Sequence, residues 1–97
     1  MKREILFRGK SIYTKVLVYG YLTSKNCIEE VEIIPETIGQ FTGLTDKNGV
    51  KIFEGDILKG GIYSRYVVEW DSYNCEFNIH AFNVDLFEII GNIHDND

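Results

Sequence analysis

Proline, cysteine and long apolar runs are scarce in this sequence. One Pro and two Cys occur among 97 residues, so neither wholesale disorder nor the dense disulfide framework of a small secreted domain is indicated. No run approaches the roughly 18 apolar residues of a membrane span, and the opening stretch MKREILFRGK lacks the apolar segment of a secretory signal. We therefore expect a cytoplasmic protein that does not associate with membranes.

The two cysteines, Cys27 and Cys75, lack the Cys-x-x-Cys spacing of redox and metal motifs. We expect reduced thiols in the core rather than a disulfide. Cys75, Phe77 and Ile79 alternate with polar residues, which is typical of one buried strand face and places Cys75 in the core.

Motifs for catalysis, cofactor binding and metal binding are also missing. His80 and His94 have no thiol or carboxylate at ligand spacing. Gly60-Gly61 lacks the strand–loop–helix setting of a phosphate-binding loop, and Cys75 lacks the context of a nucleophile elbow. We predict that the protein is not an enzyme and uses no cofactor and no metal.

Basic residues are outnumbered, since ten Lys and Arg against fifteen Asp and Glu give a net charge of −5. Phosphate backbones repel such a chain, so nucleic acid is a disfavoured partner. Two interpretations stay open: an acidic surface that maintains solubility, and an acidic face that docks a basic partner.

Aromatic and β-branched residues recur in short runs and predict a mainly β protein, all-β to α+β. The length suits a single domain over residues 1–97, with a division near Gly43 into lobes of residues 1–43 and 44–97. In the second lobe, strands at roughly 8 to 12 residue spacing indicate a barrel or sandwich. The expected strands are 4–7, a stretch within 11–24, 27–34, 50–53, 57–59, 62–70, 75–79 and 86–93.

Two stretches of the first lobe depart from a simple strand pattern. We expect Arg8-Gly9-Lys10 to interrupt the first strand as a turn or bulge. The stretch CIEEVEIIP, residues 27–35, is read as a strand, with a helix as the alternative because its apolar residues also fit a spacing of three to four.

The stretch Gly43–Lys59 contains two turn signals. Asn48-Gly49 predicts a type I′ hairpin turn, and Glu54-Gly55-Asp56 predicts a second turn. The apolar residues around these turns, Val50, Ile52 and Ile57, are expected to feed the core.

Three carboxylates in that stretch, Asp46, Glu54 and Asp56, suggest a cation site or an acid/base pair. Turn building explains them better, because Asp side chains accept hydrogen bonds from nearby backbone amides in turns. Contact with a partner is the second interpretation.

Aromatic residues cluster around Arg65 in the following segment. Most of them are expected to form the core or cross-strand pairs, whereas Tyr63 and Tyr73 lie near turns and are expected to be exposed. The candidate binding surface therefore comprises Tyr63, Arg65, Tyr73, Asp46, Glu54 and Asp56.

Four segments resemble the YopX family of phage and prophage proteins: REILFRGK, VYGYL, IGQFTGLTDKNGVKIFEGDILK and FEIIGNIHDN, in this order. The resemblance covers nearly the whole chain. It implies a mainly β protein whose carboxyl half, residues 44–97, is a small, partly open SH3-like barrel behind an amino-terminal β lobe. It also implies a phage or prophage protein in a bacterial cytoplasm, and it implies nothing about activity.

We expect an accessory protein that binds another macromolecule, most plausibly a host or phage protein, and that also forms homo-oligomers. A binder that sequesters a nucleotide or another small molecule with its aromatic residues and Arg65 is the alternative. A nucleic-acid-binding barrel face is the third hypothesis, and it would need the basic residues to gather on one side.

Overall fold

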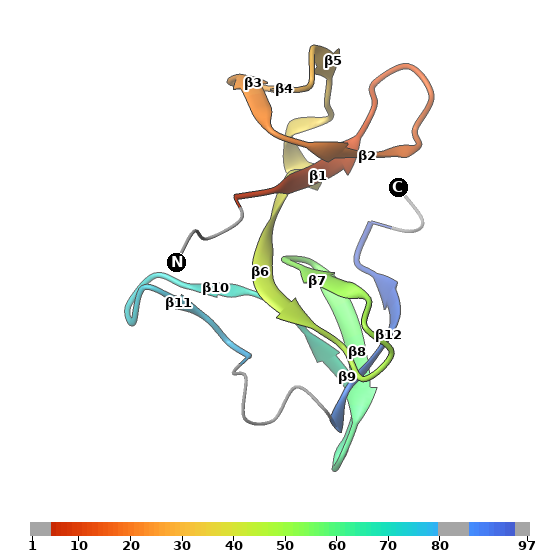
Figure 1. The fold of residues 1–97 in the computed structure, drawn as a ribbon, viewed down its shortest axis with the longest axis vertical. Coiled ribbons are helices and arrows are strands. Elements are labelled where there is room, and N and C mark those ends of the chain that lie inside the picture. Colours follow the sequence, from red (N-terminus) through yellow and green to blue (C-terminus); the bar gives the residue numbers. More distant parts are fainter. Residues whose placement is uncertain (1–4, 80–85, 95–97) are drawn as a thin grey trace. The chain divides into compact units, whose positions relative to one another are not determined.

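The structure, a computed structural model, describes residues 5–79 and 86–94 (Figure 1). Residues 1–4, 80–85 and 95–97 lie outside the described residues. Strands dominate, as predicted, and a short 3-10 helix accompanies them. No helix there is long and apolar enough to cross a membrane. Contacts divide the chain into two units, residues 1–41 and 42–97.

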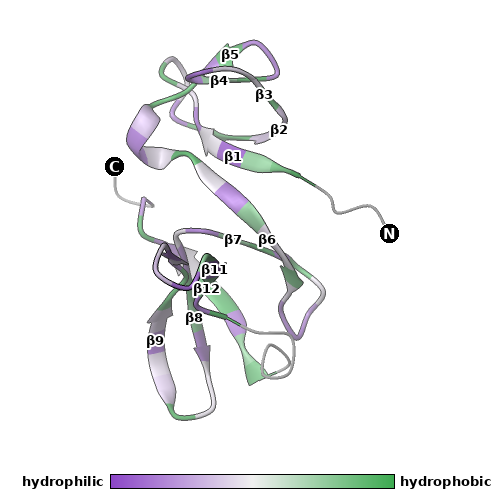
Figure 2. Cartoon of the chain, turned by 90° about the vertical axis from the view of Figure 1, so that its left-hand side faces the viewer, coloured by the Kyte–Doolittle hydropathy of each residue, from purple (hydrophilic) through white to green (hydrophobic). Residues whose placement is uncertain are grey.

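The first unit contains two small antiparallel sheets. In one, β1 lies between β2 and the start of β6; in the other, β4 lies between β3 and β5. β6 carries both hydrophilic and hydrophobic residues (Figure 2). The elements are β1 (Phe7–Lys10), β2 (Leu17–Gly20), β3 (Leu22–Ser24), β4 (Cys27–Ile28), β5 (Val31–Glu32), the 3-10 helix η1 (Pro35–Thr37) and β6 (Gly39–Thr45).

The predicted interruption at Arg8-Gly9-Lys10 is wrong, because these residues form most of β1. Gly9 is required for close approach, since a Cβ at this position would lie 2.4 Å from the Cγ2 of Ile33. Arg8 and Lys10 are buried. A glycine that lets two segments approach carries the same sequence signal as a turn glycine.

Residues 27–35 form neither one strand nor a helix. The chain reverses at Glu29 and Glu30, and β4 pairs with β5 so that Ile28 lies opposite Val31. Both Glu residues have positive φ, 49° and 71°, as the two central residues of a type I′ turn require. This turn was not foreseen because Glu rarely adopts that conformation.

The core of the first unit is small. Ile28, Ile33 and Phe41 are buried. Thr37 is also buried, and it belongs to η1, which contacts β1. The Thr37 hydroxyl accepts the backbone N–H of Lys10 at 2.8 Å and donates to the carbonyl of Ile34 at 2.7 Å. This hydroxyl therefore fixes η1 to β1.

The second unit is built on a three-stranded antiparallel sheet in the order β12-β8-β9, with a separate β10–β11 hairpin. The end of β6 neighbours β7, and the Thr42 hydroxyl donates to the carbonyl of Ile52 at 2.8 Å. The elements are β7 (Lys51–Phe53), β8 (Asp56–Gly60), β9 (Tyr63–Val67), β10 (Trp70–Asp71), β11 (Glu76–Phe77) and β12 (Glu88–Asn92).

The β6–β7 turn differs from the predicted type I′ turn. Gly49 has a φ of 82°, but Asn48 is not among the residues with positive φ. The N–H of Gly49 donates to the carbonyl of Asp46 at 2.9 Å, and the N–H of Asp46 donates to that of Val50 at 2.8 Å. This arrangement is typical of a longer hairpin loop that ends in a glycine bulge. The second predicted turn is confirmed at Gly55, whose φ is 94°.

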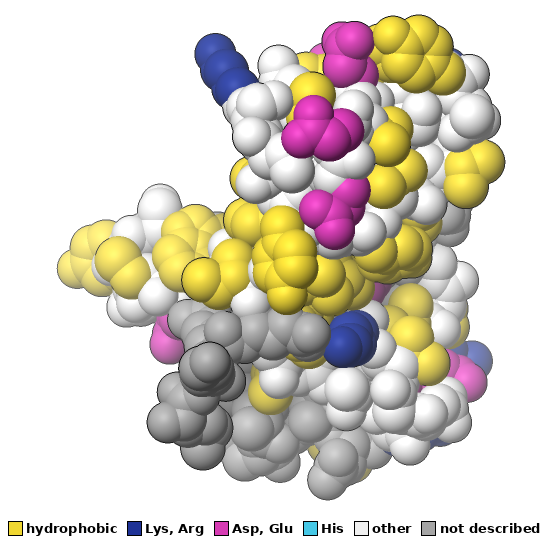
Figure 3. All heavy atoms as spheres, turned by 45° about the horizontal axis from the view of Figure 1, so that its top comes forward, with side chains coloured by type: hydrophobic (Ala, Val, Ile, Leu, Met, Phe, Trp, Pro, Cys, Tyr) yellow, Lys and Arg dark blue, Asp and Glu magenta, His cyan; other side chains and the backbone are white. Residues whose placement is uncertain are grey.

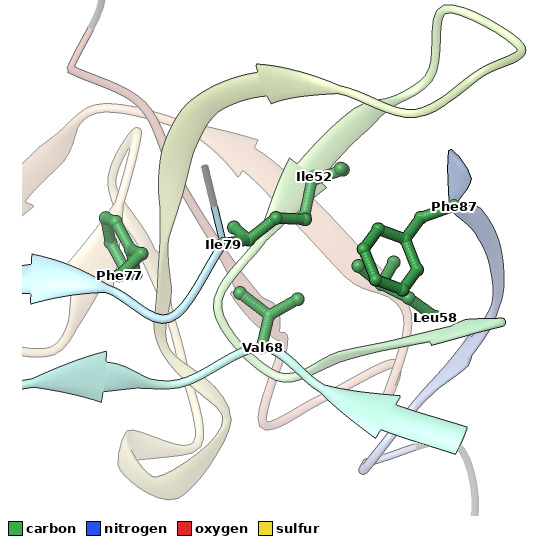
Figure 4. Close-up of a cluster of buried hydrophobic side chains, with 6 residues drawn as sticks. All are labelled: Ile52, Leu58, Val68, Phe77, Ile79 and Phe87. Atoms are coloured by element: carbon green, nitrogen blue, oxygen red, sulfur yellow. The ribbon is translucent and has the colours of Figure 1, made fainter. Parts of the chain in front are cut away.

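Six apolar side chains form the buried core of the second unit (Figure 4). Burial of Ile52 confirms its predicted core position, and Ile57 is half-buried. Val50, 53% exposed, does not enter the core, because it follows the glycine bulge at the loop. The core consists of Ile52, Leu58, Val68, Phe77, Ile79 and Phe87.

Neither cysteine lies in the fully buried core, which corrects the prediction. Cys75 is exposed in the β10–β11 turn with a φ of 54°, and Cys27 is half-buried. Both are free thiols. The alternation holds for Phe77 and Ile79, which are buried, but the strand begins only at Glu76 and so excludes Cys75.

Candidate functional site: the β10–β11 hairpin

The β10–β11 hairpin is shaped by the side chain of Asp71, at the end of β10. One carboxylate oxygen accepts the backbone N–H groups of Tyr73 and Asn74 at 3.0 and 3.2 Å. The other accepts the side-chain amide of Asn74 at 2.8 Å. These bonds close the turn locally, as expected for an Asx turn.

The base of the hairpin is fixed by Asn78. Its side-chain oxygen accepts the N–H of Glu69 at 2.9 Å, and its side-chain nitrogen donates to the carbonyl of Val67 at 2.9 Å. Its own N–H donates to the carbonyl of Glu69 at 3.0 Å. Asn78 thus replaces regular strand pairing where the chain passes from β9 to β10.

The hairpin presents aromatic side chains to solvent. Trp70 lies opposite Phe77 in the register, and the ring centroids are 5.0 Å apart in an edge-to-face arrangement. Phe77 is in the core, whereas Trp70 is 45% exposed and Tyr73, in the turn, is 94% exposed. Hydrophobic side chains gather on the arm that β10 and β11 form (Figure 3).

An open cavity of about 380 Å³ lies at this hairpin. The cavity is lined by Glu69, Trp70, Asp71, Ser72 and Asn78.

The hairpin is strongly acidic. From Glu69 to Phe77 the chain carries Asp71 and Glu76 in addition to Glu69, and it has no Lys or Arg. The hydrogen bonds from the side chain and backbone of Asn74 lower the pKa of the Asp71 carboxyl, so this group stays ionised at neutral pH. The arrangement suits a cationic group and disfavours phosphate.

A second aromatic group lies on β9. The Tyr63 and Tyr66 ring centroids are 4.9 Å apart, and Tyr66 lies 5.5 Å from Phe87. The Tyr66 hydroxyl donates to the carbonyl of Asn78. Burial, with Tyr63 and Glu69 nearby, raises the pKa of the Tyr66 phenol. Tyr66 therefore acts as a structural residue.

The structure places Tyr63 and Arg65 of the predicted surface on β9 and Tyr73 in the hairpin turn. Tyr63 is 45% exposed and Tyr73 is 94% exposed, which confirms their predicted exposure. Arg65 is also exposed. These three side chains are accessible to a partner.

The three carboxylates of the predicted surface differ in environment. Asp46 and Asp56 are buried, and Glu54 is half-buried. Asp56 accepts the backbone N–H of Phe53 at 2.8 Å, so it builds the β7–β8 turn. Within residues 5–79 and 86–94, no group of three His, Cys, Asp or Glu side chains is arranged to hold a metal ion.

Asp46 connects two distant parts of the second unit. Its Oδ1 accepts the N–H groups of Asn48 and Val50 at 2.8 and 3.0 Å, and its Oδ2 accepts that of Ile89 at 3.0 Å. Desolvation acts to raise the pKa of this carboxyl, but the three amide bonds outweigh it and the pKa is lowered. The carboxylate fixes the β6–β7 loop to β12.

Sequence reasoning did not assign Glu69, Trp70 and Asp71 to the binding surface. Asp71 precedes Tyr73 by two residues, the spacing at which an Asp side chain caps a turn. The base of the hairpin depends on Asn78, whose two side-chain bonds to Glu69 and Val67 have no sequence signature.

The chain is a small, mainly β protein whose β10–β11 hairpin is acidic and exposes aromatic side chains. The chain matches the model of the YopX protein family over residues 2–97. It therefore belongs to the YopX family, which confirms the resemblance of the four segments. Comparison with curated proteins gave no match.

Proposed function

We propose that this chain is a non-enzymatic accessory protein of a phage or prophage, which binds another protein in the bacterial cytoplasm through its β10–β11 hairpin. The exposure of Tyr73 and Trp70 on that hairpin is the observation that carries the proposal. Aromatic residues are enriched at protein interfaces, where they bury much area at a low entropic cost.

The construction of the hairpin supports this role. Trp70 packs on the core residue Phe77, while Asp71 and Asn78 fix the turn and the base through hydrogen bonds. An aromatic side chain held by its neighbours loses little conformational freedom on binding, which increases affinity. An exposed aromatic residue on a loose tail would lack this advantage.

Charge supports a protein partner over the alternatives. The net charge is −5 and the cavity is lined by Glu69 and Asp71, so phosphate groups of nucleotides or nucleic acids are repelled. The only basic residue of the predicted surface, Arg65, lies on β9. In fold terms, we propose that residues 44–97 form a small, partly open barrel of the SH3-like type that carries the hairpin as an extension.

Photo-crosslinking in living cells tests the proposal. A photoreactive benzoyl-phenylalanine replaces Tyr73 in a bacterium whose genome encodes the chain, and a matched variant carries it in place of the exposed Glu36 of η1. We expect a protease-sensitive adduct from position 73 that is absent from position 36.

The nature of the adduct decides between partner classes. A partner of a different mass supports binding to a host or phage protein, and an adduct of twice the chain's mass indicates a homo-oligomer formed through the hairpin. A nuclease-sensitive adduct, or equal labelling from both positions, would overturn the proposal.

A further inference from the structure

The β6–β7 loop contains the only Asn-Gly pair of the sequence, Asn48-Gly49, and both residues are exposed. An asparagine that precedes glycine readily loses its side-chain amide, because glycine has no side chain to hinder attack by its own backbone nitrogen. We propose that Asn48 deamidates spontaneously when the β6–β7 loop opens, and that the carboxylate formed at this position loosens the loop from β12.

The reaction needs only water as a co-reactant. The backbone nitrogen of Gly49 gives its proton to a solvent base and forms a bond to the side-chain Cγ of Asn48, while the Cγ–Nδ2 bond breaks and ammonia leaves. Water then adds to one of the carbonyl carbons of the resulting succinimide ring and opens it. The products are aspartate, with the original backbone, and isoaspartate, whose backbone is longer by one carbon.

Hydrogen bonds of the closed loop restrain the groups that must react. The N–H of Gly49, whose nitrogen is the nucleophile, donates to the carbonyl of Asp46 at 2.9 Å. The N–H of Asn48 donates to Oδ1 of Asp46 at 2.8 Å, and its side-chain Nδ2 donates to Oε2 of Glu88 on β12 at 3.4 Å. Such bonds are individually modest, so a local opening of an exposed loop is accessible from the folded state. Deamidation should therefore proceed in the folded chain, but more slowly than in the unfolded chain.

The product changes the contact between the loop and β12. The Asn48 amide donates to Glu88, whereas the product places two carboxylates opposite each other, and like charges at such a distance repel. Isoaspartate also lengthens the chain between Asp46 and Val50, whose backbone groups are bonded at 2.8 Å. The N–H of Ile89 donates to Oδ2 of Asp46 at 3.0 Å, so exchange of this amide reports on how firmly the loop is held to β12.

Ageing of the intact chain tests the reaction. The folded chain and the chain unfolded in guanidinium chloride are incubated at mildly alkaline pH, and peptide mass spectrometry locates each amide that has become an acid. We expect conversion at Asn48 in both samples, roughly tenfold slower in the folded chain because the loop bonds must break first. Asn26, which is exposed and followed by Cys27, is the control and should convert much more slowly than Asn48 in both samples.

Variants measure the effect of the new carboxylate. Asn48→Asp reproduces the aspartate product and should accelerate hydrogen exchange of the Ile89 amide about threefold, within the range of one exposed charge contact. The same substitution in a Glu88→Gln chain should have a smaller effect, because the opposing carboxylate is gone. Asn26→Asp adds the same charge in the first unit and should leave the exchange of Ile89 unchanged.

The outcomes separate the two halves of the proposal. Absence of conversion at Asn48 in the folded chain, or conversion of Asn26 at an equal rate, would overturn the assignment of the site. Equal rates in the folded and unfolded chains would show that opening of the loop does not control the reaction. Equal acceleration of Ile89 exchange with and without Glu88, or no acceleration in either chain, would overturn the loosening of the loop from β12.

Discussion

Replacing Asp46 is expected to destabilise the second unit far more than its loop position suggests. The Asp46 carboxylate is 5% exposed and accepts three backbone N–H groups, from Asn48, Val50 and Ile89. In Asp46→Asn, the side-chain oxygen can keep the two local bonds, but an NH₂ group then faces the N–H of Ile89. One charge-assisted bond is lost and two donors face each other.

A hydrogen bond to a charged group contributes about 1.5 to 3 kcal/mol, so Asp46→Asn should lower the free energy of unfolding by roughly 2 to 3 kcal/mol. Asp46→Ala removes all three acceptors and should cost about 4 kcal/mol, a large part of the 5 to 15 kcal/mol of a typical domain. Urea unfolding followed by Trp70 emission measures both effects. The midpoint of Asp46→Asn should fall by about 1 to 2 M with an unchanged slope.

Acid should reduce the difference between the native chain and Asp46→Asn. The folded pKa of Asp46 is lowered, so its stabilising effect is complete above the unfolded pKa, about 3.9, and disappears as the pH falls through the folded pKa. The Asn variant has no such dependence at this position, so the two unfolding curves should converge in acid.

The control is Glu54→Gln in the neighbouring turn, where the carboxylate accepts no hydrogen bond from the residues the structure describes. It should leave the urea midpoint nearly unchanged. If Asp46→Asn behaves like this control at neutral pH, the bond to Ile89 does not stabilise the fold and the reasoning is refuted.

Three further changes test the packing of the strands. Replacing Glu29 and Glu30 by Asn and Gly should stabilise the chain by about 0.5 to 1.5 kcal/mol, because both positions have positive φ; a lower melting temperature would contradict the turn assignment. Gly60→Ala should cost about 3 kcal/mol, since a Cβ there would lie 1.8 Å from the carbonyl oxygen of Leu86; an unchanged urea midpoint would contradict this contact. Thr37→Val keeps the side-chain volume but leaves a buried backbone amide without its acceptor, so calorimetry should show a loss of about 1 to 3 kcal/mol, against a smaller loss for Thr37→Ser.

Much of the second unit could be predicted from local patterns. The turn at Gly55, the buried side chains of Phe77 and Ile79, and the closing strand at the carboxyl end all follow from alternation and turn residues. These features depend on residues close in the sequence, so a single sequence is sufficient to find them.

The first unit could not be predicted as well from the sequence, because contacts between residues distant in the sequence determine its turns. Glu29 and Glu30 form a turn without a turn residue, since the pairing of β4 with β5 fixes their backbone. Gly9 is predicted as a turn residue but lies inside a strand. Glycine is needed there because Ile33 leaves no space for a side chain. Such positions are set by packing, which local propensity does not encode.

The candidate site likewise has one part that the sequence predicts and one part that it does not. Exposure of Tyr73 could be inferred from its place in a turn, but the cavity beside Trp70 could not. The cavity depends on hydrogen bonds from Asn78 to the chain on the other side of the hairpin. A sequence pattern locates the exposed aromatic residue, and only the fold shows the cavity that forms at the hairpin.

The most direct test of the binding surface combines crosslinking with a change in the β10–β11 hairpin. The photoreactive residue at position 73 is introduced into the otherwise native chain and into a Trp70→Ala chain, and thermal unfolding is used to select a temperature at which both are folded. We predict a strong protein adduct from the first chain and loss of that adduct from the second. An undiminished adduct in the folded Trp70→Ala chain would contradict the claim that the β10–β11 hairpin binds the partner.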